Sequence, residues 1–106
     1  DDHLRNHGFL LTPGGWVLSP AYDVNPNPEG PSGLTLNIDG TSNALDIELV
    51  MSVSEYFRLR SREALAVKEE VIAVVATWRH RATRVGLSSV EVDRMELAFQ
   101  ASCRGF

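Results

Sequence analysis

The chain has little cysteine and no long apolar run, and each absence excludes certain classes of protein. Cys103 is the only cysteine among 106 residues, which excludes an internal disulfide framework and leaves no C-x-x-C metal motif. No apolar run approaches the roughly 20 residues that span a membrane. The first residues show neither the basic segment nor the hydrophobic core of a secretory signal. We therefore expect a cytoplasmic protein without membrane contact.

An excess of positive charge is also missing. Ten lysine and arginine residues stand against fourteen aspartate and glutamate residues, which gives a formal net charge of −4. The two signs are interleaved along the chain and form no basic stripe, so we expect no direct binding of nucleic acid. The hydrophobic content of 43% suits one modest domain, which would bury about two thirds of its unfolded surface if it were compact.

The most informative stretch is residues 1–23, which read D-D-H-L-R-N-H-G-F-L-L-T-P-G-G-W-V-L-S-P-A-Y-D. Asp1 precedes Asn6 by the offset that separates the catalytic base from a metal ligand in a kinase catalytic loop. A second metal-binding carboxylate must return to the same cleft, and Asp23 follows a predicted hairpin that could deliver it. On spacing alone, an Asx-rich loop before a hairpin explains the pattern equally well, because Asp and Asn are common loop residues.

The hairpin is predicted independently of this chemistry. Residues 8–11 and 16–18 are short runs of β-favouring residues. They are separated by T-P-G-G, in which proline presets one turn torsion and glycine permits positive φ. Pro20 ends the second strand because it lacks the amide donor that a ladder needs. Asp23 then falls in irregular chain just beyond the hairpin.

Residues 24–45 are predicted to be mostly irregular. Proline and glycine are so dense in residues 25–33 that neither a helix nor a central strand can persist there. Apolar and polar residues alternate in residues 34–38, and Asp39-Gly40 follows as a turn signal, which predicts a short strand with one buried face. A border of a substrate cleft and a plain surface connection are equally good interpretations of this segment.

Three helices are predicted to fill the rest of the chain, because apolar residues recur there at intervals of three and four. Their expected ranges are residues 46–59, 61–85 and 88–101. Ser61 is the predicted N-cap of the second helix, and Gly86 ends that helix. Ser88 and Glu91 form a capping box that starts the third helix. The short link between the last two helices favours antiparallel packing.

The amino-acid sequence of these motifs resembles that of the catalytic segment in the HipA-type toxin kinases. In that family D-x-H-x-K-N leads through a hairpin to P-x-Y-D, and here D-D-H-L-R-N leads to P-A-Y-D; the later L-T-L-N-I-D-G segment is also similar. The resemblance implies that Asp1 is the catalytic base and that Asn6 and Asp23 are magnesium ligands. Arg5 stands where lysine is frequent in the family, which is a departure of little consequence.

The same resemblance implies ATP and Mg²⁺ as cofactors, a serine or threonine of a protein substrate as the phosphoryl acceptor, and restraint of the toxin by a DNA-binding antitoxin. It covers nearly the whole chain but only the C-terminal part of a family member. The N-terminal lobe with its nucleotide-binding lysine is not in this sequence. We therefore expect a piece of a kinase that is inactive by itself.

The expected fold is mainly α with a small N-terminal β-hairpin, an α+β arrangement that forms the helical C-terminal subdomain of a HipA-like, protein-kinase-like fold. Residues 1–106 are expected to form a single domain. Within it, residues 1–23 hold the catalytic loop, the hairpin and the metal-binding Asp; residues 24–45 are an irregular loop with a short strand; residues 46–106 are a helical bundle. Two other functions stay open, namely a small-molecule phosphotransferase of the aminoglycoside type and a helical interaction domain without catalysis.

Overall fold

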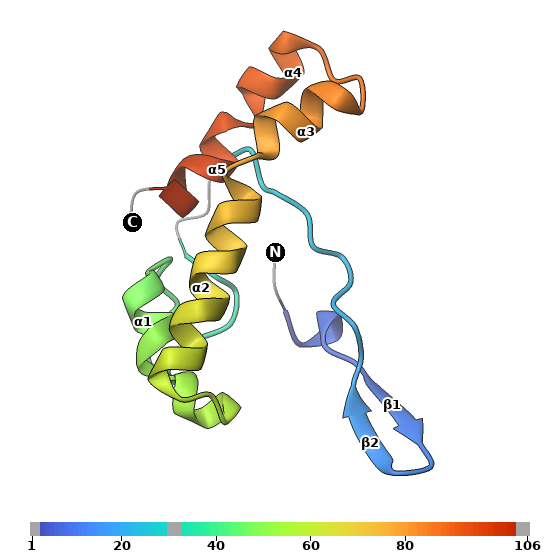
Figure 1. Ribbon diagram of the computed structural model, residues 1–106, viewed down its shortest axis with the longest axis vertical. Coiled ribbons are helices and arrows are strands. Elements are labelled where there is room, and N and C mark those ends of the chain that lie inside the picture. Colours follow the sequence, from blue (N-terminus) through green and yellow to red (C-terminus); the bar gives the residue numbers. More distant parts are fainter. Residues whose placement is uncertain (1–2, 30–32, 104–106) are drawn as a thin grey trace.

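The computed structural model describes the backbone of residues 3–29 and 33–103 and the side chains through Phe99, and it has two arms (Figure 1). One arm carries an N-terminal turn and a β-hairpin, and the other carries the helices. The chain that leaves the hairpin runs toward the far end of the helical arm and then returns to begin the first helix. Within the described ranges, no helix is both long and apolar enough to cross a bilayer.

The N-terminal arm contains the predicted hairpin. A 3₁₀ turn, η1 (Leu4–Asn6), precedes strands β1 (Phe9–Thr12) and β2 (Gly15–Leu18), which pair antiparallel from Phe9 opposite Leu18 to Thr12 opposite Gly15. Pro13 and Gly14 make the tight turn between them. Gly15 has a φ of +112°, a value that favours glycine. The turn chemistry read from the sequence is therefore confirmed.

The strand predicted for residues 34–38 is wrong. This segment has no partner strand in the described part of the chain, and it closes on itself as a loop instead. The Leu34 amide donates to the Asn43 carbonyl at 2.8 Å, and the Asn43 side chain donates back to the Leu34 carbonyl at 2.7 Å. Asp39 accepts from the Ser42 amide at 2.7 Å. Alternating polarity could not distinguish a strand from a loop whose polar groups are satisfied by side chains.

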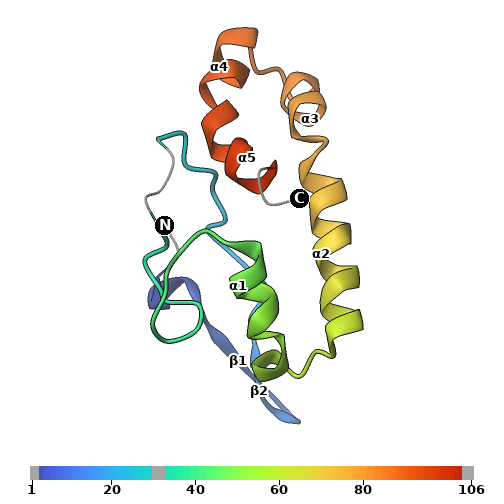
Figure 2. The same ribbon diagram turned by 90° about the vertical axis from the view of Figure 1, so that its left-hand side faces the viewer.

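The helical content is confirmed, but each predicted helix is divided in two. From residue 46 onward, the helical elements of the described residues are α1 (Ile47–Ser52), η2 (Ser54–Phe57), α2 (Ser61–Val75), α3 (Trp78–Arg84), α4 (Ser89–Arg94) and α5 (Glu96–Cys103). Figure 2 shows α1 and the returning α5 beside α2, with α3 and α4 paired at one end. The expected antiparallel pairing is therefore made by the short helices α3 and α4.

Local hydrogen bonds explain why the long second helix breaks. The Thr77 hydroxyl donates to the Val74 carbonyl at 2.8 Å, and the Thr77 amide bonds the same carbonyl at 3.1 Å. These i−3 bonds tighten the last turn of α2, and α3 starts in a new direction. The predicted N-cap was also wrong by one residue. Arg60 occupies that position, and its amide donates to Glu63 at 2.8 Å, so that Ser61 is the first helical residue.

Two helix ends agree with the prediction. The Ser88 amide donates to Glu91 Oε2 at 2.8 Å, and the Glu91 amide donates to Ser88 Oγ at 3.4 Å, which completes the capping box of α4. The Ser88 amide and then its hydroxyl hold the pKa of Glu91 below its ordinary value. Gly86 has a φ of +95°. The amides of Gly86 and Leu87 bond the carbonyls of Thr83 and Ala82, a Schellman motif that ends α3.

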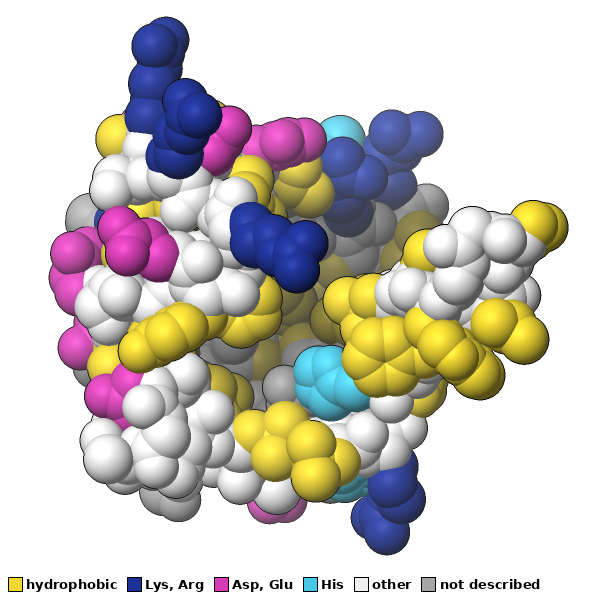
Figure 3. Space-filling model, turned by 90° about the horizontal axis from the view of Figure 1, so that it is seen from below, with side chains coloured by type: hydrophobic (Ala, Val, Ile, Leu, Met, Phe, Trp, Pro, Cys, Tyr) yellow, Lys and Arg dark blue, Asp and Glu magenta, His cyan; other side chains and the backbone are white. Residues whose placement is uncertain are grey.

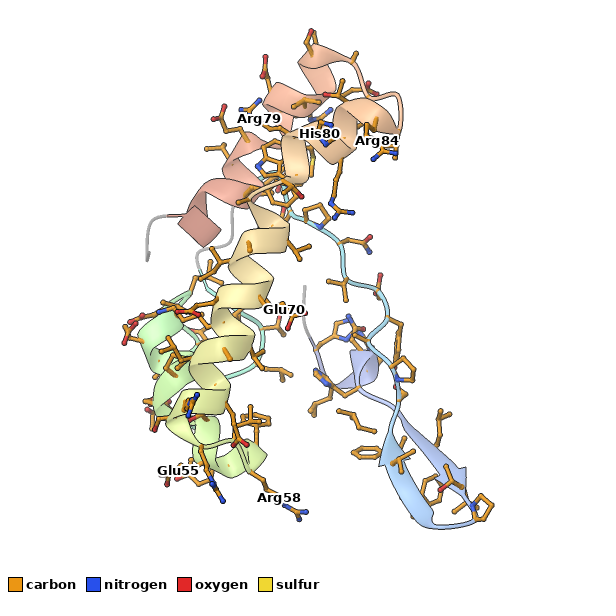
Figure 4. The ribbon with its side chains drawn as sticks, in the orientation of Figure 1. Glu55, Arg58, Glu70, Arg79, His80 and Arg84 are labelled. Atoms are coloured by element: carbon orange, nitrogen blue, oxygen red, sulfur yellow. The ribbon has the colours of Figure 1, made fainter. Side chains whose placement is uncertain are left out.

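Arg79 joins the three C-terminal helices. Figure 4 shows Arg79 on α3. Its guanidinium contacts Asp93 on α4 at 3.3 Å and Glu96 on α5 at 2.8 Å. Its guanidinium also lies 4.9 Å from the centre of the Trp78 ring, and that ring stacks on Phe99 with 4.2 Å between centroids. The bonds to Glu96 and Asp93 raise the pKa of Arg79. This cluster keeps α5 folded back toward α2.

The hydrophobic core is shallow. Val53, Ala64 and Val92 are the buried apolar side chains of the described residues. The accessible surface is 8599 Å², whereas a compact chain of this size exposes about 5,900 Å² and an unfolded one about 17,000 Å². The radius of gyration is 15.8 Å, against about 13 Å for a compact domain. The chain thus buries about half of its surface, less than the two thirds that a compact form would bury.

Gly86 provides a test of the α3–α4 connection. Gly86→Ala should lower the free energy of unfolding by about 1 to 2 kcal/mol, because left-handed backbone brings Cβ against the following carbonyl. Thermal melting followed by circular dichroism measures the loss. Gly14→Ala is the matched control, since its φ lies outside the left-handed region and its Cβ would meet only Thr12 Oγ1, at 3.8 Å. Equal losses in both variants would contradict the assignment.

Candidate functional site

The structure brings Asn6 and Asp23 to one cavity. Asn6 is the half-buried last residue of η1, and Asp23 is an exposed residue just beyond β2. The cavity measures about 450 Å³, and its lining consists of Asn6, His7 and residues 18–25. Because the hairpin returns the chain to its own starting point, two polar side chains from opposite ends of the motif share this space.

A single tight turn positions Asn6. The Asn6 amide donates to the His3 carbonyl at 2.8 Å, and the His7 amide donates to the Leu4 carbonyl at 3.2 Å. These bonds make the 3₁₀ turn η1, after which the chain extends into β1. The side chain of Asn6 is thereby delivered to the base of the hairpin.

The two sides of the hairpin base are tied together. The Ser19 amide donates to the Gly8 carbonyl at 2.8 Å, which continues the ladder one step beyond the strands. The Tyr22 hydroxyl donates to the Arg5 carbonyl at 2.6 Å. A Cβ on Gly8 would lie 3.3 Å from Ser19 Oγ and 3.5 Å from the Tyr22 hydroxyl. The absence of a side chain at Gly8 allows this close approach.

Asp23 has an unusual backbone conformation. Its φ is +56°, in the left-handed region that few residues other than glycine, asparagine and aspartate adopt. Asn25 Nδ2 donates to Asp23 Oδ1 at 2.7 Å. The second carboxylate oxygen receives no hydrogen bond from the described residues. Strained conformations of this kind gather at functional sites, and here one carboxylate oxygen is oriented while the other faces solvent.

The oxygen donors of this site fit a magnesium ion that is shared with phosphates. Mg²⁺ is usually held by one or two carboxylates together with waters and substrate phosphates, and seldom by an all-protein cage. The described residues contain no cluster of three or more His, Cys, Asp or Glu side chains arranged to hold a metal. Asn6 supplies an amide oxygen and Asp23 a carboxylate. His3 Nδ1 is buried without a hydrogen-bond partner among the described residues, and a nitrogen donor does not suit Mg²⁺.

The structure does not describe the position of the expected catalytic base. Asp1 and its neighbour Asp2 lie outside the described residues, so the assignment of Asp1 as catalytic base stays a prediction. Tyr22 was overlooked as a site residue in the sequence. The signal that could have found it is its place in P-A-Y-D, directly before the proposed metal ligand.

The family comparison agrees with these motifs. The described residues form a mainly helical α+β domain with a polar site at the base of its hairpin. The family model of the HipA-like C-terminal domain matches residues 1–84, which include the whole candidate site. The chain therefore belongs to the HipA-like C-terminal domain family. Comparison with curated proteins and comparison with solved structures both give no match.

Asp23→Asn tests whether Asp23 binds a metal ion. Asparagine tolerates the left-handed backbone, so the melting temperature should stay unchanged while the affinity for Mn²⁺, used as a spectroscopic substitute for Mg²⁺, falls at least about 10-fold. Electron paramagnetic resonance of free Mn²⁺ measures the affinity. Glu55→Gln removes the same charge from an exposed side chain on η2 in the helical arm (Figure 4) and serves as the control. Unaltered Mn²⁺ affinity in Asp23→Asn would reduce Asp23 to a turn residue.

Proposed function

We propose that this chain is the C-terminal part of a HipA-like serine/threonine protein kinase, which transfers the γ-phosphoryl group of ATP to a protein hydroxyl. One observation carries the proposal: Asn6 and Asp23, the two expected metal ligands, line the same cavity although the whole hairpin separates them in sequence. Membership of the HipA-like C-terminal domain family supports the same interpretation.

The roles of the residues follow from the chemistry of phosphoryl transfer. Asn6 and Asp23 would hold Mg²⁺ through their side-chain oxygens, and the bound ion would neutralise charge on the transferring phosphate. Asp1 would orient the acceptor hydroxyl and take its proton. Positioning and charge neutralisation supply most of the catalysis in this reaction class, so a small set of fixed polar side chains is sufficient.

The surface of the chain supports a role within a larger assembly. Large apolar side chains are exposed along the hairpin, including Phe9, Leu11, Trp16 and Leu18. Figure 3 shows hydrophobic side chains over much of this projecting arm. Apolar patches of this kind mark contacts with other polypeptide. We propose that a nucleotide-binding lobe completes the kinase, that a DNA-binding antitoxin restrains it, and that it acts in the cytoplasm.

A helical interaction domain without catalysis is the second candidate. It is favoured by an apolar cavity of about 650 Å³, which is bounded by α1, α2 and residues 34–45. Apolar cavities lined by helices are common sites for a partner helix. Phosphoryl transfer by the full-length protein separates the two candidates, because an interaction domain requires no intact Asp1.

Comparison of the adjacent carboxylates Asp1 and Asp2 tests the kinase proposal. In the full-length protein, Asp1→Asn should lower the rate of phosphoryl transfer by about 10² to 10⁴, the usual contribution of a positioned general base. Asp2→Asn should have a much smaller effect, because a shift of one residue turns the side chain away from the cleft. Single-turnover rates at saturating ATP measure the chemical step without interference from weakened nucleotide binding.

The outcomes are distinct. If Asp2→Asn is the damaging change, the register of the loop is wrong and the role of Asn6 must be reassigned with it. If neither substitution affects transfer, the carboxylates are not catalytic. If the unaltered protein does not phosphorylate any acceptor, the interaction domain becomes the better interpretation.

A further inference from the structure

A side-chain hydrogen bond of Tyr22 connects the two segments that carry the candidate site. Tyr22 immediately precedes Asp23, and Arg5 immediately precedes Asn6. The Tyr22 hydroxyl donates to the Arg5 carbonyl at 2.6 Å. This bond therefore joins the side chain of the residue before Asp23 to the backbone of the residue before Asn6.

The side chains around this bond are largely exposed. Tyr22 is 46% exposed and Leu18, at the end of β2, is 64% exposed, so the base of the hairpin is not embedded in a core. A two-stranded hairpin alone is marginally stable in water. Two hydrogen bonds between described residues hold the segment after β2 against the turn before β1. The Ser19 amide donates to the Gly8 carbonyl, and the Tyr22 hydroxyl donates to the Arg5 carbonyl.

The lack of a side chain at Gly8 lets Ser19 and Tyr22 come close to the backbone at that position. A Cβ at Gly8 would stand 3.5 Å from the Tyr22 hydroxyl and 3.3 Å from Ser19 Oγ, and the second distance is tighter than ordinary contact. The ring of Tyr22 thus passes over a position without a side chain to reach the Arg5 carbonyl. A phenylalanine would fit the same space, but it would lose the bond.

We propose that Tyr22 is a positioning residue for metal binding: through the Arg5 carbonyl it keeps Asn6 and Asp23 at one cavity. The proposal rests on the kinase function proposed above. Tyr22 lines the same cavity, but its hydroxyl donates to the Arg5 carbonyl, so the role assigned to it is to position the ligands rather than to bind the ion. Its contribution is to fix the separation of two ligands that lie on different segments, which lowers the cost of gathering them around an ion.

Tyr22→Phe in the full-length protein tests the proposal, because it removes the hydroxyl and keeps the ring. We expect the Mg²⁺ concentration at half-maximal transfer rate, and the dissociation constant for Mn²⁺, to rise about 2- to 10-fold, the range that corresponds to one net hydrogen bond. The rate at saturating Mg²⁺ and the melting temperature should stay near those of the unaltered protein. This separation distinguishes positioning of the ligands from general support of the fold.

Tyr56→Phe is the matched control. Tyr56 is 86% exposed on η2 in the helical arm, where the same loss of a hydroxyl should leave metal dependence unchanged. Hydrogen exchange provides a readout that does not require activity. The amides of Asn6 and His7 close the η1 turn, and they should exchange faster in Tyr22→Phe than in Tyr56→Phe.

Unchanged metal dependence together with unchanged exchange of these amides in Tyr22→Phe would overturn the proposal. Equal effects of Tyr22→Phe and Tyr56→Phe would overturn it as well, because the response would then not be local. Absence of phosphoryl transfer in the unaltered protein would instead refute the kinase function. In that case the Mn²⁺ affinity and the exchange rates still decide whether Tyr22 positions the two ligands.

Discussion

Buried apolar surface is scarce in this chain, and the shortage leaves local hydrogen bonds to decide where elements begin and end. Burial is normally the dominant favourable term in folding, yet the described residues bury few side chains fully. Asp46 starts α1 by accepting from the Glu48 amide at 2.9 Å, and the reciprocal bonds of Ser88 start α4. Each such contact is worth about 1 kcal/mol. The shape therefore depends on many of them together.

The shortage of buried apolar surface is clearest in the hairpin. The strand register places Phe9, Leu11, Trp16 and Leu18 on one face, because Phe9 pairs with Leu18 and Leu11 pairs with Trp16. All four are more than 60% exposed. An uncovered face of this kind is unfavourable in water, so we infer that another polypeptide segment covers it in the working protein. The same hairpin ends at the cavity that Asn6 and Asp23 line, so the uncovered face and the candidate site belong to one element.

The existence of most elements could be predicted from the sequence, whereas their interruptions could not. Proline and glycine fix the hairpin turn by their own torsions, and the Ser88 capping box and Gly86 act on immediate neighbours, so these features are local. The break between α2 and α3 depends on the Thr77 hydroxyl, a group that helices also tolerate. The strand expected at residues 34–38 required a partner strand that the described chain does not supply. The spacing of apolar residues predicts neither the hydrogen bond of Thr77 nor the lack of a partner strand.

In the candidate site, too, some features follow from the local sequence and others depend on contacts between distant segments. The spacing of Asn6 and Asp23 around a hairpin does not distinguish a metal site from an Asx-rich loop, and their proposed roles come from the resemblance to the family motifs. The structure adds that both residues line one cavity. The bond from Tyr22 to Arg5 could not be read from a pattern, because it depends on how the strands bring the chain back to its start. The left-handed backbone of Asp23 costs on the order of 1 kcal/mol or more. The bond from Asn25, together with the bond of the preceding tyrosine, can offset a cost of that size. The orientation of the carboxylate therefore depends on residues on both sides of Asp23.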